Sequence, residues 1–291
     1  MAILNYYSPL SRPGFHGAVT STIDWCEANY QFSYYVAEMA NSFSNLVTVG
    51  FAVWGFYLAV AESLPKRLRL GFAGIALVGL GSFYFHATLR FEAQLVDELP
   101  MIWVTSTAIW LLFDQDPGFT SMSTRTRLLT VAAVVFNVSF SWSYYINRNP
   151  VYHQVVFGML LLLIAGRIRY LLVHSALGKR IPAEKKRTIG TIFSLGVAQF
   201  LLAFLIWNLD NIFCETLTRW KVSIGWPAAF LLEGHSWWHV ASGTYFKFAG
   251  IHDYIKLTCI NRSLCVKDDH RNFAIQYRMG LPYVKRVDRR I

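Results

Sequence analysis

Three histidines in this sequence are spaced so that they could bind a metal ion. His235 and His239 are four residues apart, so an α-helix would place both imidazoles on one face. With His86 from a second helix, they could give Zn²⁺ three protein ligands and leave a fourth position for water, as in catalytic zinc sites. Without a glutamate beside the first histidine, the His235–His239 spacing alone also fits a packed, hydrogen-bonded pair.

Two further polar residues lie near His86 in the sequence. Ser82 precedes His86 by one helical turn, and Asp97 follows it across a short turn. An aspartate beside the metal could hold or deprotonate the water at the open position. A serine hydroxyl there could donate a hydrogen bond to the oxyanion of a tetrahedral intermediate. Ser82 and Asp97 therefore favour a hydrolytic site over a purely structural one.

A second group of candidate ligands lies near the N-terminus. Asp24, Glu27 and Glu38 lie close together in the sequence with Asn29, and residues 24–38 include no Lys, Arg or His. Carboxylates gathered in this way repel one another unless a cation lies among them, and hard oxygen ligands suit Ca²⁺. The spacing equally fits a solvated acidic loop in which Asp24 caps a helix.

The composition indicates that these residues belong to a membrane protein. Of the 291 residues, 54% are hydrophobic and 15% are charged, whereas soluble domains carry about 25% charged residues. The net charge of +10 therefore does not indicate a soluble nucleic-acid-binding protein. Crossing a bilayer takes about 20 helical residues, and seven apolar stretches approach or exceed that length. They lie at residues 38–61, 68–87, 95–113, 127–147, 151–173, 189–209 and 226–248.

The distribution of basic residues predicts the orientation of these spans. Most of the 27 Lys and Arg residues fall on one side, and the other side has only Arg12, Arg90, Arg148, Arg219 and Lys221. Because cytosolic loops are enriched in Lys and Arg, the C-terminus is expected in the cytosol and the N-terminus in a lumen or outside the cell. We expect an N-terminal lumenal segment over 1–37, an all-α seven-transmembrane-helix bundle over 38–248 and a basic cytosolic tail over 249–291.

This orientation brings distant parts of the chain to one leaflet of the membrane. The end of the second stretch, with His86, and the starts of the third and seventh, with Asp97 and His235, all meet on the non-cytosolic side. Ionisable residues are costly inside a membrane and mark functional sites. Cys26 and Cys214 fall on the same oxidising side, so a disulfide between them is expected, with two unpaired thiols as the alternative.

The motifs together resemble those of the alkaline ceramidases, and the resemblance extends from about residue 15 to residue 250. The matching runs are Asp24-Trp25-Cys26-Glu27-x-Asn29-Tyr30, Ala37-Glu38, Asn41-x-x-Ser44-Asn45, Gly81-Ser82-x-x-x-His86, Asp97-Glu98-x-Pro100-Met101 and His235-x-Trp237-Trp238-His239.

The resemblance implies a seven-span enzyme of the endoplasmic reticulum or Golgi membrane that hydrolyses the amide of ceramide to a fatty acid and a sphingoid base. It implies zinc as the catalytic metal and calcium as a structural or activating ion. Ceramide is the implied partner, with no nucleic acid and no obligatory protein partner. The implied residues are His86, His235 and His239 for zinc; Ser82 and Asp97 beside it; Asp24, the main-chain carbonyl of Trp25, Glu27, Asn29 and Glu38 for calcium; and a Cys26–Cys214 disulfide.

A different class of protein remains as an alternative. A seven-span receptor or lipid-binding protein of the same superfamily could keep zinc as a structural ion. Ser82 and Asp97 argue against it, because a structural zinc needs neither a base nor an oxyanion donor. A transporter is disfavoured, since no Gly/Pro-interrupted helices occur in repeated positions.

Overall fold

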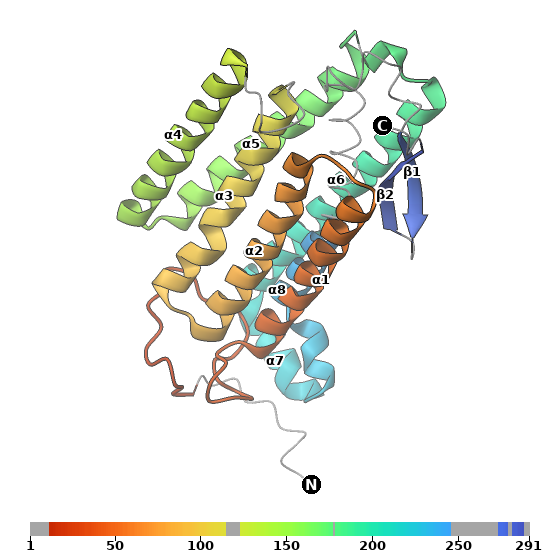
Figure 1. Cartoon of the computed structure of the whole chain (residues 1–291). Helices are drawn as coiled ribbons and strands as arrows, with labels where there is room; N and C mark the ends of the chain where they lie inside the picture. Colours follow the sequence, from red (N-terminus) through yellow and green to blue (C-terminus); the bar gives the residue numbers. More distant parts are fainter. Residues whose placement is uncertain (1–11, 115–122, 177, 246–272, 279–280, 288–291) are drawn as a thin grey trace. The chain divides into compact units, whose positions relative to one another are not determined.

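The computed structural model describes residues 12–114, 123–176, 178–245, 273–278 and 281–287 (Figure 1). Six helices in these ranges are long and apolar enough to cross a membrane. At a rise of 1.5 Å per residue, a 23-residue helix is about 35 Å long and exceeds the ~30 Å bilayer core. The fold is therefore that of an all-α, multi-pass membrane protein with six candidate spans. They are α1 (Met39–Ala61), α2 (Lys66–Thr88), α3 (Phe91–Phe113), α4 (Thr124–Asn147), α5 (Pro150–Val173) and α6 (Ala183–Ile212).

The turn between α4 and α5 illustrates how local sequence ends one helix and begins the next. Arg148 adopts a left-handed conformation (φ 53°) and its backbone N–H donates to Tyr144 O, which closes the last turn of α4. The Asn149 side chain then accepts a hydrogen bond from the Val151 N–H, and Pro150 occupies the first turn of α5. A tight connection of this kind lets two membrane-spanning helices run antiparallel.

The seventh predicted span differs from the expectation in its first half. The peptide bond between Trp226 and Pro227 is cis, and a 3₁₀ turn, η3 (Ala228–Leu232), follows before α8 (Gly234–Tyr245) begins. The α-helix therefore starts at Gly234, after the 3₁₀ turn, rather than at the predicted residue 226. Residues 246–248 of the predicted span lie outside the described residues.

A short helix, a β-hairpin and a 3₁₀ turn were not predicted. Helix α7 (Cys214–Ile224) lies between α6 and η3 and is too polar to resemble a span, with Glu215, Arg219 and Lys221 in eleven residues. In the basic tail, β1 (Phe273–Arg278) pairs antiparallel with β2 (Leu281–Arg286). A further short 3₁₀ turn, η2 (Gly178–Arg180), precedes α6.

The chain divides into two compact units whose boundaries pass through α1, α2, α3 and α6. The first unit comprises Met1–Gly50, Ala76–Glu98 and Val197–Tyr245. The second comprises Phe51–Ile75, Leu99–Gly196 and Phe246–Ile291. Every residue that the sequence nominated for chemistry falls in the first unit.

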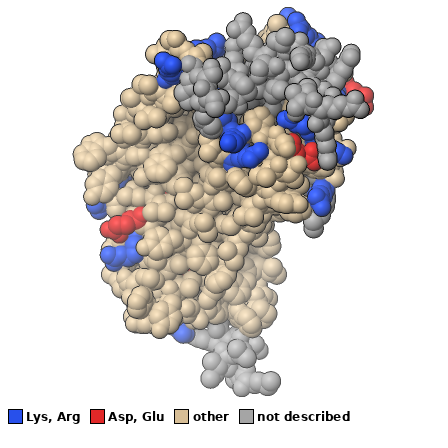
Figure 2. Space-filling view, in the orientation of Figure 1, with Lys and Arg blue, Asp and Glu red and all other residues tan. Residues whose placement is uncertain are grey.

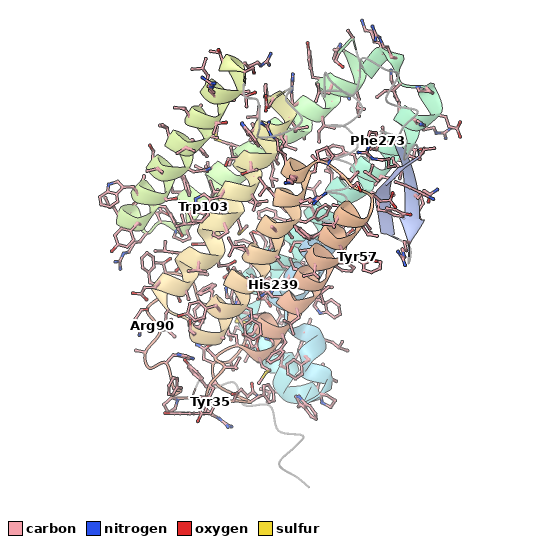
Figure 3. All side chains as sticks on the ribbon, viewed as in Figure 1. Tyr35, Tyr57, Arg90, Trp103, His239 and Phe273 are labelled. Atoms are coloured by element: carbon pink, nitrogen blue, oxygen red, sulfur yellow. A yellow bond between two sulfur atoms is a disulfide. The ribbon has the colours of Figure 1, made fainter. Side chains whose placement is uncertain are left out.

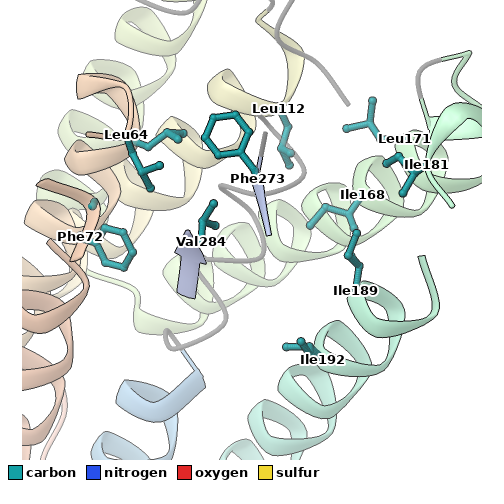
Figure 4. Packing of buried hydrophobic residues seen from close by; sticks show 12 residues of the cluster. Leu64, Phe72, Leu112, Ile168, Leu171, Ile181, Ile189, Ile192, Phe273 and Val284 are labelled. Carbon is teal, nitrogen blue, oxygen red and sulfur yellow. The ribbon is translucent and has the colours of Figure 1, made fainter. Parts of the chain in front are cut away.

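The second unit has an apolar core to which the hairpin contributes. Phe273 and Val284 are almost fully buried against Leu64, Leu112 and Ile168 (Figure 4). The unit also buries an ion pair between Arg67 and Asp114. The Thr126 hydroxyl donates to Asp114 at 2.6 Å, so the buried carboxylate has two side-chain partners.

The outer surface carries large apolar side chains, as expected for helices that face lipid. Most of the surface drawn in Figure 2 carries no Lys, Arg, Asp or Glu. On α4 alone, Leu128, Val131, Val138 and Trp142 are each at least 60% exposed. Such a continuous apolar surface is rare on soluble monomers and supports the membrane assignment.

Candidate metal centre

Three buried histidines converge in the first unit. His86 lies near the end of α2, and His235 and His239 lie in the first two turns of α8 (His239 is labelled in Figure 3). Their candidate ligand nitrogens all lie within 4.8 Å of one another. The Nε2 atoms of His86 and His235 are 3.3 Å apart. Tetrahedral zinc with Zn–N bonds of about 2.0–2.1 Å requires about 3.3–3.4 Å between two ligand nitrogens, so the His86–His235 pair has the spacing that zinc requires.

The hydrogen bonds behind two of these rings orient their free nitrogens toward the cluster. The Nδ1–H of His86 donates to Glu38 Oε2 at 2.5 Å. His239 Nδ1 lies 2.8 Å from the Ser44 hydroxyl, which itself donates to Asn41 O, and 3.2 Å from the Asn45 amide nitrogen. With the proton on Nδ1, His86 and His239 each have the Nε2 lone pair available for a metal. Three Nε2 atoms that face one another suit a shared cation.

His235 is held differently from the other two histidines. Its Nδ1 is buried and has no hydrogen-bond partner within the described ranges. Its ring instead stacks on the indole of Trp25, with centroids 3.6 Å apart and an interplanar angle of 14°. Trp207 packs edge-on against the same indole. The N-terminal segment thus contacts the metal-ligand cluster through an aromatic side chain that the sequence suggested only as a main-chain ligand.

Ser82 and Asp97 lie beside the histidines. The Ser82 hydroxyl is 3.5 Å from His239 Nε2 and hydrogen-bonds the Asp97 side chain. Helices α2 and α3 approach closely here, because a Cβ on Gly81 would lie 2.2 Å from the backbone oxygen of Val96. Asp97 is partly exposed, whereas the three histidines are buried. A partly exposed carboxylate therefore lies near three buried histidines, with Ser82 between them.

The acidic residues of the N-terminal segment cap α1 and support His86. The Glu27 carboxylate accepts the backbone N–H groups of Ala40 at 2.7 Å and Asn41 at 2.8 Å, which satisfies the first turn of α1. Glu38 is fully buried, and the backbone N–H of Glu38 donates to His86 O at 3.0 Å. The sequence assigned Glu38 to calcium and missed its bond to His86, although a buried carboxylate one residue before an apolar helix is a signal for such a role.

Burial and mutual repulsion raise the pKa values of these carboxyl groups. Burial, followed by repulsion from Glu233, raises the pKa of Glu27 to about 8. Burial, followed by repulsion from Glu27 and Asp24, holds the pKa of Glu38 well above its usual value. Burial also raises the pKa of Asp24, which lies near the Asn29 amide (3.4 Å). Within the described ranges, however, only the histidines form a group of three or more His, Cys, Asp or Glu with converging ligand atoms.

A disulfide ties the N-terminal segment to α7. Cys26 and Cys214 are bonded, with their Cα atoms 5.3 Å apart. Beside it lie two buried charged residues that the sequence analysis did not single out as a pair. Lys221 Nζ donates to Glu233 Oε2 at 2.6 Å and to Cys26 O at 3.1 Å. Helix α7 is therefore fixed to the segment that carries Trp25.

Comparison with known proteins identifies the family. Residues 17–285 match the Ceramidase family. The chain is 32% identical to alkaline ceramidase 3 of Mus musculus over 234 residues (80% of this chain, 83% of the mouse protein). It is 34% identical to alkaline ceramidase YPC1 of Saccharomyces cerevisiae over 271 residues (88% and 83%). It is 29% identical to the alkaline ceramidase of Arabidopsis thaliana over 275 residues (93% and 94%). This chain, with its buried histidine triad beside a serine and an aspartate, therefore belongs to the ceramidase family.

Proposed function

We propose that this chain is an alkaline ceramidase that hydrolyses the amide bond of ceramide with a zinc ion held by His86, His235 and His239. The observation that carries the proposal is the convergence of three buried histidines, two of which have their Nδ1 atoms hydrogen-bonded. When bound, zinc lowers the pKa of a coordinated water toward about 7 and polarises a carbonyl oxygen.

Asp97 is the proposed general base. Its carboxylate takes a proton from the attacking water as the water oxygen adds to the amide carbon. When the C–N bond breaks, the same carboxyl group gives that proton to the departing nitrogen, so the products are a fatty acid and the free amine of a sphingoid base. Its partial exposure and its hydrogen bond to Ser82 support this role.

Ser82 is the proposed oxyanion donor. Its hydroxyl is 3.5 Å from His239 Nε2, and this closeness to a candidate zinc ligand supports the role. Hydrogen bonds to a developing oxyanion contribute roughly 2.7–4 kcal/mol to transition-state stabilisation. Glu38 and Ser44 hold the rings of His86 and His239 in the orientation that presents Nε2.

A calcium ion bound by Asp24, the main-chain carbonyl of Trp25, Glu27, Asn29 and Glu38 forms the second part of the proposal. The raised pKa values of Glu27 and Glu38 support it, because a cation would relieve the cost of their buried charges. The Glu38 Oε1 atom is buried and has no hydrogen-bond partner within the described ranges, which leaves it available as a ligand. Calcium would act here as a structural or activating ion.

The proposed topology has seven spans, with residues 226–248 as the seventh, a lumenal N-terminus and a cytosolic C-terminus, in the endoplasmic reticulum or Golgi membrane. The Cys26–Cys214 disulfide supports a non-cytosolic location for the histidine end of the first unit, because disulfides persist in oxidising compartments.

The test is fatty-acid release from a panel of ceramides by the detergent-purified protein. His235→Ala should abolish release, whereas His174→Ala, which removes an exposed histidine at the end of α5, should not. Full activity of folded His235→Ala would contradict the zinc mechanism. A wild-type protein that holds zinc but cleaves no ceramide would instead indicate the receptor or lipid-binding alternative.

A further inference from the structure

The three histidines depend on their surroundings in different ways. His86 and His239 have Nδ1 hydrogen bonds that fix their rings. His235 has no such bond within the described ranges. Its ring position therefore depends on its backbone, in the first turn of α8, and on the Trp25 indole stacked against it. Whatever holds these two parts of the chain together also determines where the third ligand nitrogen lies.

A buried carboxylate from α6 holds the backbone at the start of α8. Asp210 is 2% exposed, and its Oδ1 accepts the Gly234 N–H at 3.0 Å. The same carboxylate lies against the backbone of His235 and of Cys26. The first N–H groups of a helix have no partner within the helix, and a negative charge there is favourable. Asp210 thus contacts both the helix that carries His235 and the residue that follows Trp25.

The packing at this point leaves little freedom for movement. A Cβ on Gly234 would lie 2.9 Å from both the Cβ and the Oδ1 of Asp210, so only glycine lets α6 and α8 approach this closely. Lys221, fully buried in α7, links the same two parts of the chain, the start of α8 and the segment around Cys26. It bonds Glu233, the residue before α8, and the carbonyl of Cys26. None of these residues has a part in the proposed proton transfers.

We propose that Asp210, assisted by the Lys221–Glu233 ion pair, is the positioning residue for His235. It acts by fixing the first turn of α8 against the Cys26 backbone. This contact determines where the His235 ring lies relative to the Trp25 indole and to the other two histidines. The inference rests on the proposed zinc site. It predicts that changes at Asp210 alter metal affinity and geometry, although Asp210 touches neither metal nor substrate.

The test is the zinc dissociation constant of the purified full-length protein, measured by competition with a chelator. Partners behind metal ligands typically change affinity by 10–100-fold, so Asp210→Ala should bind zinc about 10–100-fold more weakly. Asp210→Asn keeps one oxygen acceptor for Gly234 but loses the charge, and should fall between Asp210→Ala and the wild type. The absorption spectrum of the Co²⁺-loaded variants should depart from the wild-type spectrum in the same order.

A matched control separates positioning from general loss of stability. Asp114→Ala removes a buried aspartate from its ion pair with Arg67 in the second unit. It should lower the thermal stability but leave the zinc affinity and the Co²⁺ spectrum unchanged. A merely structural role for Asp210 would give the same result as this control.

The outcomes are distinct. The positioning role is refuted if every Asp210 variant that folds binds zinc as tightly as the wild type and has the same Co²⁺ spectrum. If Asp210→Ala does not fold, the result for Asp210→Asn decides. Weaker binding in the Asp210 variants, with wild-type affinity in Asp114→Ala, supports it. If the wild type itself binds no zinc, the proposed function fails rather than the assignment of Asp210.

Discussion

Replacing Gly81 by alanine should separate metal binding from catalysis. Gly81 lies on α2 next to Ser82, where α2 crosses α3. An added Cβ would lie 2.2 Å from Val96 O, 2.8 Å from Val96 C and 3.2 Å from the Cα of Asp97. All three are backbone atoms, so no side-chain rotation can relieve the clash. The helix that carries Asp97 must move instead.

The size of the effect follows from these distances. Non-bonded atoms pack at about 3.5 Å or more, so the backbone falls short by about 1.3 Å at Val96 O and about 0.3 Å at the Asp97 Cα, and a rigid retreat of α3 that relieves the clash moves Asp97 by about 1 Å. Overpacking of this kind costs about 1–3 kcal/mol of stability. A 1 Å displacement of a catalytic group can cost about 100-fold in rate. Because the three histidines lie on α2 and α8 rather than α3, we expect kcat to fall about 100-fold while zinc remains bound.

The assay is ceramide hydrolysis by the purified protein, with zinc content measured on the same sample. Gly71→Ala is the matched control, because Gly71 also lies on α2 and a Cβ there would have nothing within 4 Å. Alanine favours a helix over glycine by about 1 kcal/mol, so Gly71→Ala should be at least as stable as the wild type and fully active. A wild-type kcat in Gly81→Ala would show that the α2–α3 contact does not set the position of Asp97.

Three further predictions concern the residues around the histidines. Glu38→Gln should weaken zinc binding by about 10-fold or more when assayed without calcium, because His86 loses its charged partner; an unchanged zinc dissociation constant would contradict this role. In calcium-free protein, the pKa of Glu27 is about 8 when folded and 4.5 as a free side chain, so the native state keeps a proton that the unfolded state releases. Stability should therefore decrease as the pH rises from about 4.5 to about 8. At the proposed calcium site, affinity for calcium should increase over that range because calcium displaces the proton. Melting temperatures with and without calcium at about pH 6 and about pH 9 test this. Replacing both Cys26 and Cys214 by serine should cost about 2–4 kcal/mol of stability relative to the oxidised wild type, measured by thermal unfolding, and a reduced wild-type sample should match the variant.

Hydropathy predicted most of the long helices, and the orientation that the charges indicate stays a prediction. Six of the seven predicted stretches correspond to helices long enough to span a membrane. These helices could be predicted because a helix surrounded by lipid must carry apolar side chains on the faces that meet the lipid. On α4 the exposed side chains are apolar, as this requires. The seventh stretch was predicted less accurately, because its hydropathy continues across Pro227 while its backbone does not become helical until Gly234.

The paired charges could not be predicted from the sequence. Counting charges along the chain treats Lys221 and Arg67 as residues of solvated loops. In the structure both are almost fully buried in ion pairs, with Glu233 and with Asp114. Which acid lies beside which base is a property of the tertiary structure, and no local spacing reports it. The hairpin that buries Phe273 was missed for a similar reason, since its strands are short and lie in a basic tail.

The distinction between a catalytic and a structural zinc site rests on what completes the coordination. Structural sites are closed by four protein ligands, whereas catalytic sites have three and an open position. Within the described residues the cluster contains three histidines, and Ser82 and Asp97 lie on the side of His239 Nε2; neither side chain carries a nitrogen or sulfur atom that could close the site as a fourth ligand of that kind. A hydroxyl next to His239 and a partly exposed carboxylate behind it are the groups that amide hydrolysis needs, a donor for the oxyanion and a carrier for the proton. A receptor would have no use for either group at that position, so the arrangement around the histidines, rather than the histidines themselves, favours the hydrolase.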